Sequence, residues 1–430
     1  MTKNKWKKAL SLIPSGNSLI SKNPNFILPN LWPTYFKRAT GFNVWDMNNQ
    51  KYIDMFFGVG TNILGYKNKF VDKKVIDCIN KSNMSSLNCF EEVELAEKLT
   101  SIHPYMNMAK FARTGAEANS IAIRIARATT GKDNIAICGY HGWSDWYLAA
   151  NLKGNSNLNN HLLRGLSVDG IPKQLKKTIY TFEYNNFLEF KKIINNTKLA
   201  AVIMEVSRTF LPNTNFLKKI REECTKNNIV LIFDECTSGF RQSYGGLHKI
   251  YKIYPDMAMF GKALGNGYAI TSIIGKKEVM ENAKKTFISS TFWTERLGFV
   301  AGLATLKIMK KTQSWKIITN IGKKIKKEWL KCSFKTNVEI KISGLDALPA
   351  FSFTNDRNNI LITFFCQEML KKGFLVSNVV FVSIVHNDKI LSRYFENCHK
   401  IFKLISENSI KDIEKKLSSV TRKSSFSRLN

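Results

Sequence analysis

The sequence predicts an α/β fold: a large domain on a mostly parallel sheet covered by helices, and a smaller α+β domain formed by the two chain ends. Two observations support this. Short, nearly continuous apolar runs recur through the middle of the chain, as expected of strands buried on both faces. Amphipathic stretches with helical spacing separate them, which is the alternation of strands joined by crossover helices. No internal repeat interrupts the pattern, so we expect a continuous fold.

The regular middle of the chain supplies the expected strands, at residues 135–138, 200–204, 229–233, 257–260 and 270–274. Apolar residues follow helical spacing from Ala118 onward, and Gly131 is well placed to end that helix. A second helix is expected over 216–226. Because these elements alternate, their strands should lie mostly parallel.

The two ends of the chain have a different pattern. Short strands and turns are expected around Val44 and Tyr52, whereas the tail combines a strand at 350–353 with helices over 360–371 and 392–407. We therefore expect residues 1–72 and 312–430 to build the small domain together. Residues 73–311 are the expected large domain.

Composition narrows the class of protein. The 430 residues are 44% hydrophobic, which allows a substantial core. No apolar stretch approaches the roughly 20 residues that span a bilayer, and residues 1–12 lack the apolar core of a signal peptide, so we expect a cytoplasmic protein with no membrane partner. Eight cysteines without C-x-x-C spacing indicate neither a disulfide framework nor a metal site.

The formal net charge of +32 raises the question of nucleic-acid binding. Lysines are spread along the whole length, and no recognisable nucleic-acid module surrounds them. A solvated, lysine-biased surface explains this pattern better, so no nucleic-acid partner is expected. Such a surface can still steer an anionic substrate toward a cleft.

An acidic pair and a lysine carry the chemistry. Asp234 and Glu235 end an apolar run, and Lys262 follows the next expected strand in a glycine-rich turn. A carboxylate at the end of a buried strand can hold a proton on the ring nitrogen of pyridoxal phosphate (PLP), while a neighbouring lysine forms an imine with its aldehyde. Alone, Asp234 could cap a turn and Lys262 could be solvated. Together they indicate PLP chemistry.

Two further turns fit the same cofactor. Thr114, Gly115 and Ala116 precede a helix, where free N–H groups and the helix dipole favour a phosphate, although Thr114 could also be an ordinary helix cap. Tyr140 and His141 follow the next strand, and an aromatic side chain there could stack on a flat ring or pack in the core.

These candidates converge on one edge of the expected sheet. Tyr140, Glu205, Asp234 and Lys262 each follow or end a strand. Ligands of such sheets bind at the carboxyl ends of the strands, so we expect the four side chains to line one site.

The chain resembles class III aminotransferases of PLP fold type I, and within them the branch containing glutamate-1-semialdehyde 2,1-aminomutase. The motifs that carry the resemblance extend over nearly the whole chain: GFNVWD at 41–46, NILGY at 62–66, EVELA at 92–96, AIRIARA at 122–128, DECTSGFR at 234–241 and PDMAMFGKALGNG at 255–267.

The resemblance implies a role for each matching position. Lys262 would be the Schiff-base lysine and proton shuttle, and Asp234 the partner of the pyridine nitrogen. Tyr140 would stack on the ring, and the turn from Thr114 through Gly115 to Ala116 would hold the phosphate. His141 and Glu205 match further positions around the cofactor. Thr291 matches a threonine that reaches the phosphate of a neighbouring subunit, which implies a homodimer with shared sites.

Several positions depart from the family pattern. Val206 replaces a proline, Cys236 replaces a valine that packs under the ring, and the bulky residues 292–296 replace a small, glycine-bearing segment. No C-terminal arginine of the kind that clamps a second carboxylate in some relatives is evident. Arg38, Arg113 and Arg296 are candidate clamps, and each could equally form a surface or structural ion pair.

Three functions therefore remain open. An aminotransferase that passes an amino group from a small-molecule amine to a carbonyl substrate is the leading hypothesis. The aminomutase reaction, an intramolecular amino transfer in tetrapyrrole precursor synthesis, is the alternative. A binding protein without catalysis is a third, which the intact Asp234 and Lys262 disfavour.

Overall fold

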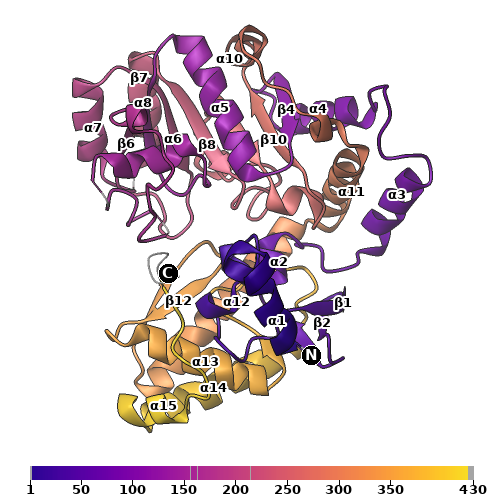
Figure 1. The fold of residues 1–430 in the computed structure, drawn as a ribbon, viewed down its shortest axis with the longest axis vertical. Coiled ribbons are helices and arrows are strands. Elements are labelled where there is room, and N and C mark those ends of the chain that lie inside the picture. Colours follow the sequence, from indigo (N-terminus) through magenta and orange to yellow (C-terminus); the bar gives the residue numbers. More distant parts are fainter. Residues whose placement is uncertain (1, 155, 162, 214, 425–430) are drawn as a thin grey trace. The chain divides into compact units, whose positions relative to one another are not determined.

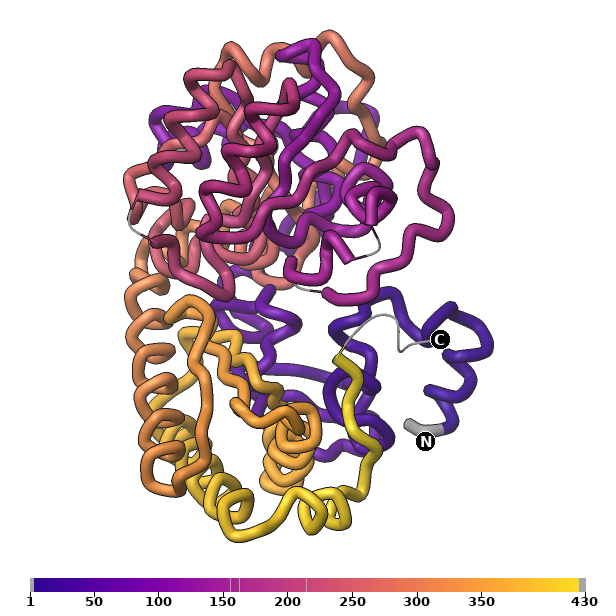
Figure 2. The backbone as a smooth tube through the Cα atoms, turned by 90° about the vertical axis from the view of Figure 1, so that its left-hand side faces the viewer, coloured from indigo at the N-terminus to yellow at the C-terminus, as the bar shows by residue number. Residues whose placement is uncertain are grey.

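The computed structural model describes residues 2–154, 156–161, 163–213 and 215–424, and the chain forms two compact units. Unit 1 joins both chain ends, Met1–Asn68 with Lys316–Asn430, and unit 2 is the continuous stretch Lys69–Trp315. In Figures 1 and 2 the indigo and yellow ends accordingly belong to one body and the magenta middle to the other. The expected domain limits at residues 72 and 311 stay a prediction.

Unit 2 is built on a seven-stranded sheet in the order β4-β10-β9-β8-β7-β5-β6. Its strands are β4 (Met108–Ala112), β5 (Asn134–Cys138), β6 (Ile179–Thr181), β7 (Leu199–Glu205), β8 (Val230–Glu235), β9 (Met257–Phe260) and β10 (Thr271–Gly275). The expectation of a mostly parallel sheet is confirmed, since neighbours from β6 to β9 all pair in parallel.

Strand β10 is the exception, because it pairs antiparallel with both β9 and β4. The connection from β9 to β10 covers residues 261–270 and contains only the short helix η6 (Lys262–Gly265). A parallel return needs a crossover of about a dozen residues or more, usually with a helix. The chain therefore reverses direction here, and the turn carrying Lys262 lies at the edge where β9 ends.

Burial explains the composition of the central strands. Every residue of β7, β8, β9 and β10 is buried, so both faces of the sheet are covered there. Helix α5 (Gly115–Thr130) packs against β4 and β7 to β10 and crosses the sheet in Figure 1. Its buried stripe includes Ile121 and Ile125, and Gly131 ends it in the left-handed region at φ 65°, as predicted.

Helix α8 (Phe216–Lys226) has the predicted bounds and packs against β8. The other helices and short 3₁₀ turns of unit 2 are α3 (Lys69–Ile79), α4 (Glu91–Ile102), α6 (Asp145–Leu148), η4 (Ala149–Leu152), η5 (Lys173–Leu175), α7 (Phe187–Asn196), α9 (His248–Tyr251), α10 (Lys277–Met280), η7 (Glu281–Lys285), η8 (Thr291–Thr294) and α11 (Arg296–Thr312).

Unit 1 contains two small sheets. The first has the order β1-β2-β3-β13, with β1 (Phe36–Thr40), β2 (Asn43–Asp46), β3 (Lys51–Asp54) and β13 (Phe374–Leu375); the second pairs β11 (Ile340–Ser343) with β12 (Ala350–Phe353). Strand β13 lies parallel to β3, so the two chain ends share one sheet. This confirms a smaller α+β domain built from both ends.

The helices of unit 1 match the expected tail closely. Helices expected over 360–371 and 392–407 are α13 (Asn358–Lys371) and α14 (Asp388–Ser406). The others are α1 (Thr2–Leu12), η1 (Pro14–Gly16), η2 (Ile20–Lys22), η3 (Pro24–Phe26), α2 (Phe57–Gly60), α15 (Ile410–Lys416) and α12 (Ser314–Thr336), which begins at the end of unit 2.

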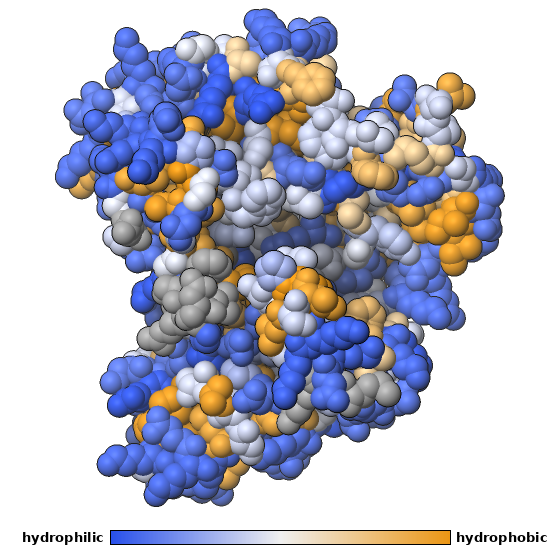
Figure 3. All heavy atoms as spheres, viewed as in Figure 1, coloured by the Kyte–Doolittle hydropathy of each residue, from blue (hydrophilic) through white to orange (hydrophobic). Residues whose placement is uncertain are grey.

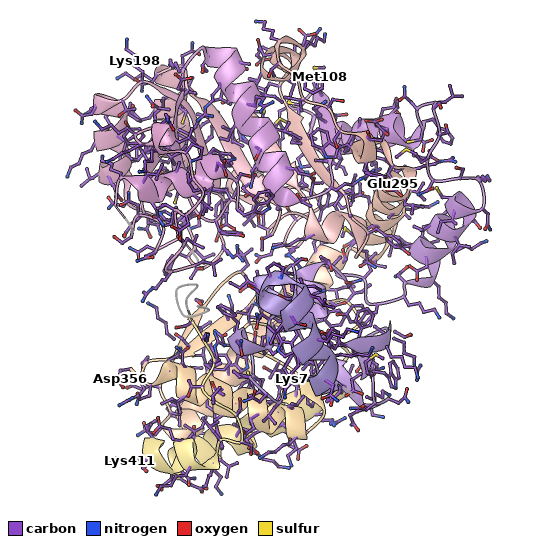
Figure 4. The ribbon with its side chains drawn as sticks, in the orientation of Figure 1. Lys7, Met108, Lys198, Glu295, Asp356 and Lys411 are labelled. Carbon is purple, nitrogen blue, oxygen red and sulfur yellow. The ribbon has the colours of Figure 1, made fainter. Side chains whose placement is uncertain are left out.

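The surface reflects the lysine-rich composition. Hydrophilic residues dominate the face in Figure 3, and the exposed Lys198 and Lys411 lie at the outline of the molecule in Figure 4. Among the described residues, no helix is long and apolar enough to cross a membrane, and no cluster of three or more His, Cys, Asp or Glu could hold a metal. All eight cysteines are free thiols.

Candidate functional site

The carboxyl ends of neighbouring strands bring the expected site residues together within unit 2. Glu205 ends β7 and lies directly opposite Asp234 of β8 in the sheet register. Asp234 in turn pairs with Met259 of β9, and Lys262 follows that strand as the first residue of η6. Tyr140 lies two residues beyond the end of β5. Parallel pairing thus places these four positions along one edge of the sheet.

Asp234 is a buried carboxylate with three hydrogen-bond donors. Oδ2 accepts from Asn119 Nδ2 at 2.8 Å and lies 2.9 Å from His141 Nδ1, and Oδ1 accepts from the backbone N–H of Cys236 at 3.1 Å. Burial acts to raise the pKa of this carboxyl, but the contact with His141 and the other hydrogen bonds outweigh it and hold the pKa below its usual value. Asp234 is therefore ionised at neutral pH.

His141 orients Asp234 rather than lying exposed at the site. Its ring is 1% exposed and stacks at 19° against Trp146, with 6.5 Å between centroids. Its carbonyl accepts from Asn119, so the same amide group holds both His141 and Asp234. Nε2 of His141 has no hydrogen-bond partner in the described structure.

Lys262 has an amine that is easily deprotonated. Nζ donates to Thr237 Oγ1 at 2.8 Å, which fixes the end of the side chain beside the loop that follows β8. Burial and then the positive charges of Arg208 and Arg241 lower the pKa of Lys262 to about 8. Its φ of 38° lies in the left-handed region, a strained conformation that non-glycine residues adopt mainly where surrounding structure imposes it.

Cys236, which stands where the family has a valine, lies between two glycine turns. Its Sγ is 3.3 Å from where a Cβ on Gly115 would lie and 3.5 Å from the equivalent point on Gly261. Burial raises the pKa of this thiol well above its usual value, so it stays protonated. Cys236 therefore acts as a small, neutral side chain at the start of α5.

The start of α5 offers two unused backbone donors. The N–H groups of Gly115 and Ala116 have no acceptor among the described residues, whereas the next two N–H groups bond back to Thr114. Free N–H groups at the N-terminus of a 16-residue helix form an anion site when a phosphate is present. This turn retains the capacity that the sequence predicted.

Thr114 itself is a helix cap. Its backbone N–H and its hydroxyl both donate to Glu117 Oε2, at 2.8 and 3.0 Å, and Oγ1 accepts from the N–H of Glu117 in a full capping box. The structural interpretation of Thr114 is thus realised. Capping does not exclude a contact with phosphate, so the role expected for Thr114 beside Gly115 and Ala116 stays a prediction.

Tyr140 and Glu205 are linked through the loop after β5. The N–H of Tyr140 donates to Glu205 Oε2 at 3.2 Å, and the half-buried ring makes an edge contact with Tyr147 at 5.9 Å. Gly139 allows this approach, because it has φ 117° and an added Cβ would lie 2.8 Å from Glu205 Oε2.

Sequence reasoning missed four residues of this site: Asn119, Thr237, Arg208 and Arg241. Asn119 is a polar residue 2% exposed in the apolar stripe of α5, which is a detectable signal because such groups need buried partners. Arg208 lies three residues beyond Glu205, and its Nη1 is 3.2 Å from Glu205 Oε1. The Nε of the buried Arg241 donates to the carbonyl of Thr237 at 2.6 Å.

The arginines proposed as clamps have structural partners. Arg113 donates to backbone carbonyls of Ala269, Phe292, Trp293 and Glu295, and its Nη2 lies 3.4 Å from the carboxylate of Glu295, labelled near α11 in Figure 4. Arg296 donates two hydrogen bonds to the carboxylate of Glu91, from Nε at 2.9 Å and from Nη2 at 2.7 Å. Arg38, in unit 1, stacks on Trp45 at 3.8 Å.

Thr291 begins η8 and is exposed. Its carbonyl accepts from Thr294 Oγ1 at 2.8 Å, while its own hydroxyl has no hydrogen bond within the described chain. A single chain does not test a contact with a neighbouring subunit, so the role expected for Thr291 stays a prediction.

Three tryptophans near the start of α5, Trp143, Trp146 and Trp293, have different surroundings. Trp146 is 8% exposed and bonds through Nε1 to Ser120, so it belongs to the core. Trp143 and Trp293, by contrast, line a cavity of about 310 Å³ beside α5 that also touches Ala116 and Glu117. These two aromatic side chains therefore lie in a cavity that borders the start of the helix.

These residues fit PLP. Asp234 offers an ionised carboxylate to a protonated ring nitrogen, because its contacts with Asn119, His141 and the N–H of Cys236 stabilise the charged form. Lys262 offers an amine of low basicity to an aldehyde. Gly115 and Ala116 offer unpaired N–H groups to a phosphate. Each end of the cofactor thus has a counterpart at one edge of the sheet.

Comparison with known proteins agrees with this fit. A family model described as Aminotransferase class-III matches residues 29–405. A 3-aminobutyryl-CoA aminotransferase of Cloacimonas acidaminovorans is 34% identical over 361 residues, 82% of this chain and 83% of that protein. A glutamate-1-semialdehyde 2,1-aminomutase of Sulfurisphaera tokodaii is 30% identical over 424 residues, 93% of this chain and 99% of that protein.

Solved structures share the fold. The FumI protein of Sphingopyxis sp. MTA144, in its PLP internal aldimine form, superposes with a TM-score of 0.87 at 23% identity, covering 98% of both chains. An omega-transaminase from Sphaerobacter thermophilus gives 0.85 at 19% identity, covering 95% of this chain and 98% of that one. The fold is therefore PLP fold type I, and the chain belongs to the class III aminotransferase family of PLP-dependent enzymes.

Proposed function

We propose that this chain is an aminotransferase in which Lys262 is the covalent anchor of the cofactor and the catalytic base, and Asp234 is the partner of the cofactor's ring nitrogen. The observation that carries the proposal is the pairing of a carboxylate whose pKa is held low with an amine whose pKa is lowered to about 8, at the ends of adjacent strands. Strongly perturbed groups of this kind cluster at active sites.

Two side chains of the protein hold or transfer the protons that the reaction needs. Bound PLP supplies an aldehyde and an electron-withdrawing ring. The ionised carboxylate of Asp234 holds a proton on the ring nitrogen, with His141 and Asn119 fixing its direction. At pH 7 an amine of pKa about 8 is neutral in roughly a tenth of molecules, so Lys262 can accept a proton from the substrate carbon and return it.

Binding and assembly complete the proposal. Gly115 and Ala116 hold the phosphate, and Tyr140 covers the ring. Thr291, whose hydroxyl has no bond within the described chain, reaches the phosphate of a second copy in a homodimer with shared sites. A cytoplasmic location is part of this proposal, supported by the eight free thiols.

The aminomutase reaction is a second candidate, because relatives with that name align over more than nine-tenths of this chain. Identity does not separate the two candidates, because a 3-aminobutyryl-CoA aminotransferase and one of the aminomutases are each 34% identical to this chain.

A visible absorption spectrum of the protein loaded with PLP tests the proposal. Single amines are added in turn, including glutamate and 4,5-diaminovalerate. Conversion to the pyridoxamine form by a simple amine supports aminotransfer, and conversion by the diamino compound alone supports the aminomutase. A protein that gives no cofactor band contradicts both.

A further inference from the structure

Arg208 is a cation of the site that the proposed chemistry does not use. It lies in the loop after β7, three residues beyond Glu205, and its Nη1 is 3.2 Å from Glu205 Oε1. Its side chain keeps 21% of its surface exposed, in contrast to the fully buried Arg241. Arg208 is thus anchored to Glu205 at one nitrogen and is partly exposed.

The hydrogen-bonding capacity of Arg208 is largely unused. A guanidinium has five N–H donors in a planar fork. The bond to Glu205 uses one Nη1 donor, and Nε and Nη2 have no acceptor among the residues that the structure describes. The Nε/Nη2 edge is the one that binds a carboxylate through two parallel bonds.

The ion pair with Glu205 places Arg208 at the end of β7, next to the strand end that carries Asp234. Burial lowers the pKa of Lys262 most, and the positive charge of Arg208 is the next largest cause. Burial raises the pKa of Tyr140, and the charge of Arg208 opposes that rise. Its partner Glu205 bonds to the N–H of Tyr140 and faces Asp234 across the sheet. The guanidinium therefore lies within electrostatic range of the lysine amine and the tyrosine ring.

The ion pair with Glu205 also removes an obstacle. An unpaired carboxylate at this strand end would repel an anionic substrate, and Arg208 neutralises it. Glu205 in return holds the guanidinium in one orientation, with its remaining bond to Tyr140 fixing the loop. A prearranged fork loses less entropy when it binds a carboxylate.

Other arginines do not offer the same edge. Arg113 is used by four backbone carbonyls, and Arg296 forms a two-bond pair with Glu91. Arg241 is buried with 0% exposure. Among these arginines of unit 2, Arg208 alone combines exposure, unused donors and closeness to Lys262.

We propose that Arg208 binds a carboxylate of the substrate through its Nε/Nη2 edge, so that this enzyme prefers amino acids and oxo acids to neutral amines and neutral carbonyl compounds. The inference rests on the proposed function, since it places the substrate beside Lys262. It assigns a substrate class and a specificity residue within the loop after β7.

Matched amine donors test this assignment with the PLP-loaded full-length protein. L-Alanine and 2-aminopropane differ only in a carboxylate replaced by a methyl group, and 3-aminobutyrate and 2-aminobutane form a second pair with the carboxylate one carbon further away. The rate of loss of the lysine-linked cofactor band is followed against donor concentration. In Arg208→Gln, the half-saturating concentration of the preferred carboxylated donor should rise about 10- to 100-fold, as expected for lost charge-assisted bonds. That of its neutral partner should change less than about threefold.

Two further variants separate binding from folding. Arg164→Gln removes an exposed arginine of the same unit that has no ion pair in the described structure, and it should leave both donors unaffected. The double variant Glu205→Gln with Arg208→Gln leaves no unpaired carboxylate, so its stability should be maintained. It should still lose preference for the carboxylated donor.

The outcomes are distinct. Selective loss for carboxylated donors in both Arg208 variants supports the inference. The inference is overturned if the Arg208 variants lose carboxylated and neutral donors equally. It is also overturned if the wild-type enzyme does not prefer the carboxylated donor in either pair. Neither result affects the role of Lys262. A wild-type protein without a cofactor band contradicts the proposed function itself.

Discussion

At the scale of single residues, Lys262 and Asp234 divide the chemistry. Replacing Lys262 by Ala should reduce turnover by about 10² to 10⁴-fold or more, because the variant loses both its covalent anchor and its base. Bound PLP should be retained, since Gly115 and Ala116 hold its phosphate independently of the lysine. Cofactor content and single-turnover rate measured on the same sample check this, and an active variant would remove Lys262 from its role.

The lowered pKa of Lys262 gives a second residue-scale prediction. The reacting form of the amine is neutral, so its fraction rises as pH increases and levels off above the pKa. The rate at which PLP-free protein links the cofactor should therefore increase through about pH 8 and then become constant. Stopped-flow absorbance between pH 6 and about 10 measures it. A midpoint near the usual value of a solvated lysine would contradict the described environment.

Arg208→Gln extends this test. Removing a positive charge near Lys262 makes protonation of the amine easier, so the midpoint should move to higher pH. Arg164→Gln serves as the control and should leave the midpoint unchanged.

At the scale of elements, the loop after β5 depends on one glycine. Gly139 has φ 117°, and an added Cβ would lie 2.8 Å from the Glu205 carboxylate, so Gly139→Ala should destabilise the protein by about 2 kcal/mol or more and disturb the bond from Tyr140 to Glu205. Gly131→Ala is the matched control, because Gly131 also has positive φ but meets nothing within 4 Å. It should cost only about 1 kcal/mol. Urea unfolding of both variants measures the difference, and equal losses would show that Gly139 matters for its backbone conformation alone.

Elements also show what the sequence could reveal. The apolar runs of β7, β8 and β9 and the stripe of α5 were predictable because period and composition are local properties. The antiparallel direction of β10 was not predicted, although the short connection between β9 and β10 implies it. Asn119 and Arg208 were missed because their importance comes from partners 115 and 3 positions away, and only the folded sheet shows which partners matter.

At the scale of the whole molecule, the net charge of +32 has a limited meaning. Exposed lysines are spread over both units, and many surface pairs, such as Lys73 with Asp77, are solvated and weak. The charge supports solubility and attraction of anions over long range, which agrees with a carboxylated substrate. It decides neither the fold nor the reaction.

A shared active site gives the final prediction. If Thr291 serves the phosphate of a second copy, Thr291→Ala should weaken PLP retention in a dimer, and Lys262→Ala should be inactive. A mixed dimer of the two variants has one site with both residues intact and one with neither. Random reassociation makes half of the dimers mixed, so about a quarter of wild-type activity should return at limiting PLP.

Complementation of this kind separates sharing from local binding. The variants are mixed under conditions that exchange subunits, and activity is compared with that of each variant alone at the same limiting PLP concentration. If Thr291 instead contacts the cofactor of its own chain, no mixed dimer contains an intact site and the activity stays at the average of the two variants. Normal PLP retention by Thr291→Ala in a proven dimer would equally exclude the role. Recovery toward a quarter would show that the exposed turn at η8 completes the site of a neighbouring copy, which is why its hydroxyl has no partner within the described part of one chain.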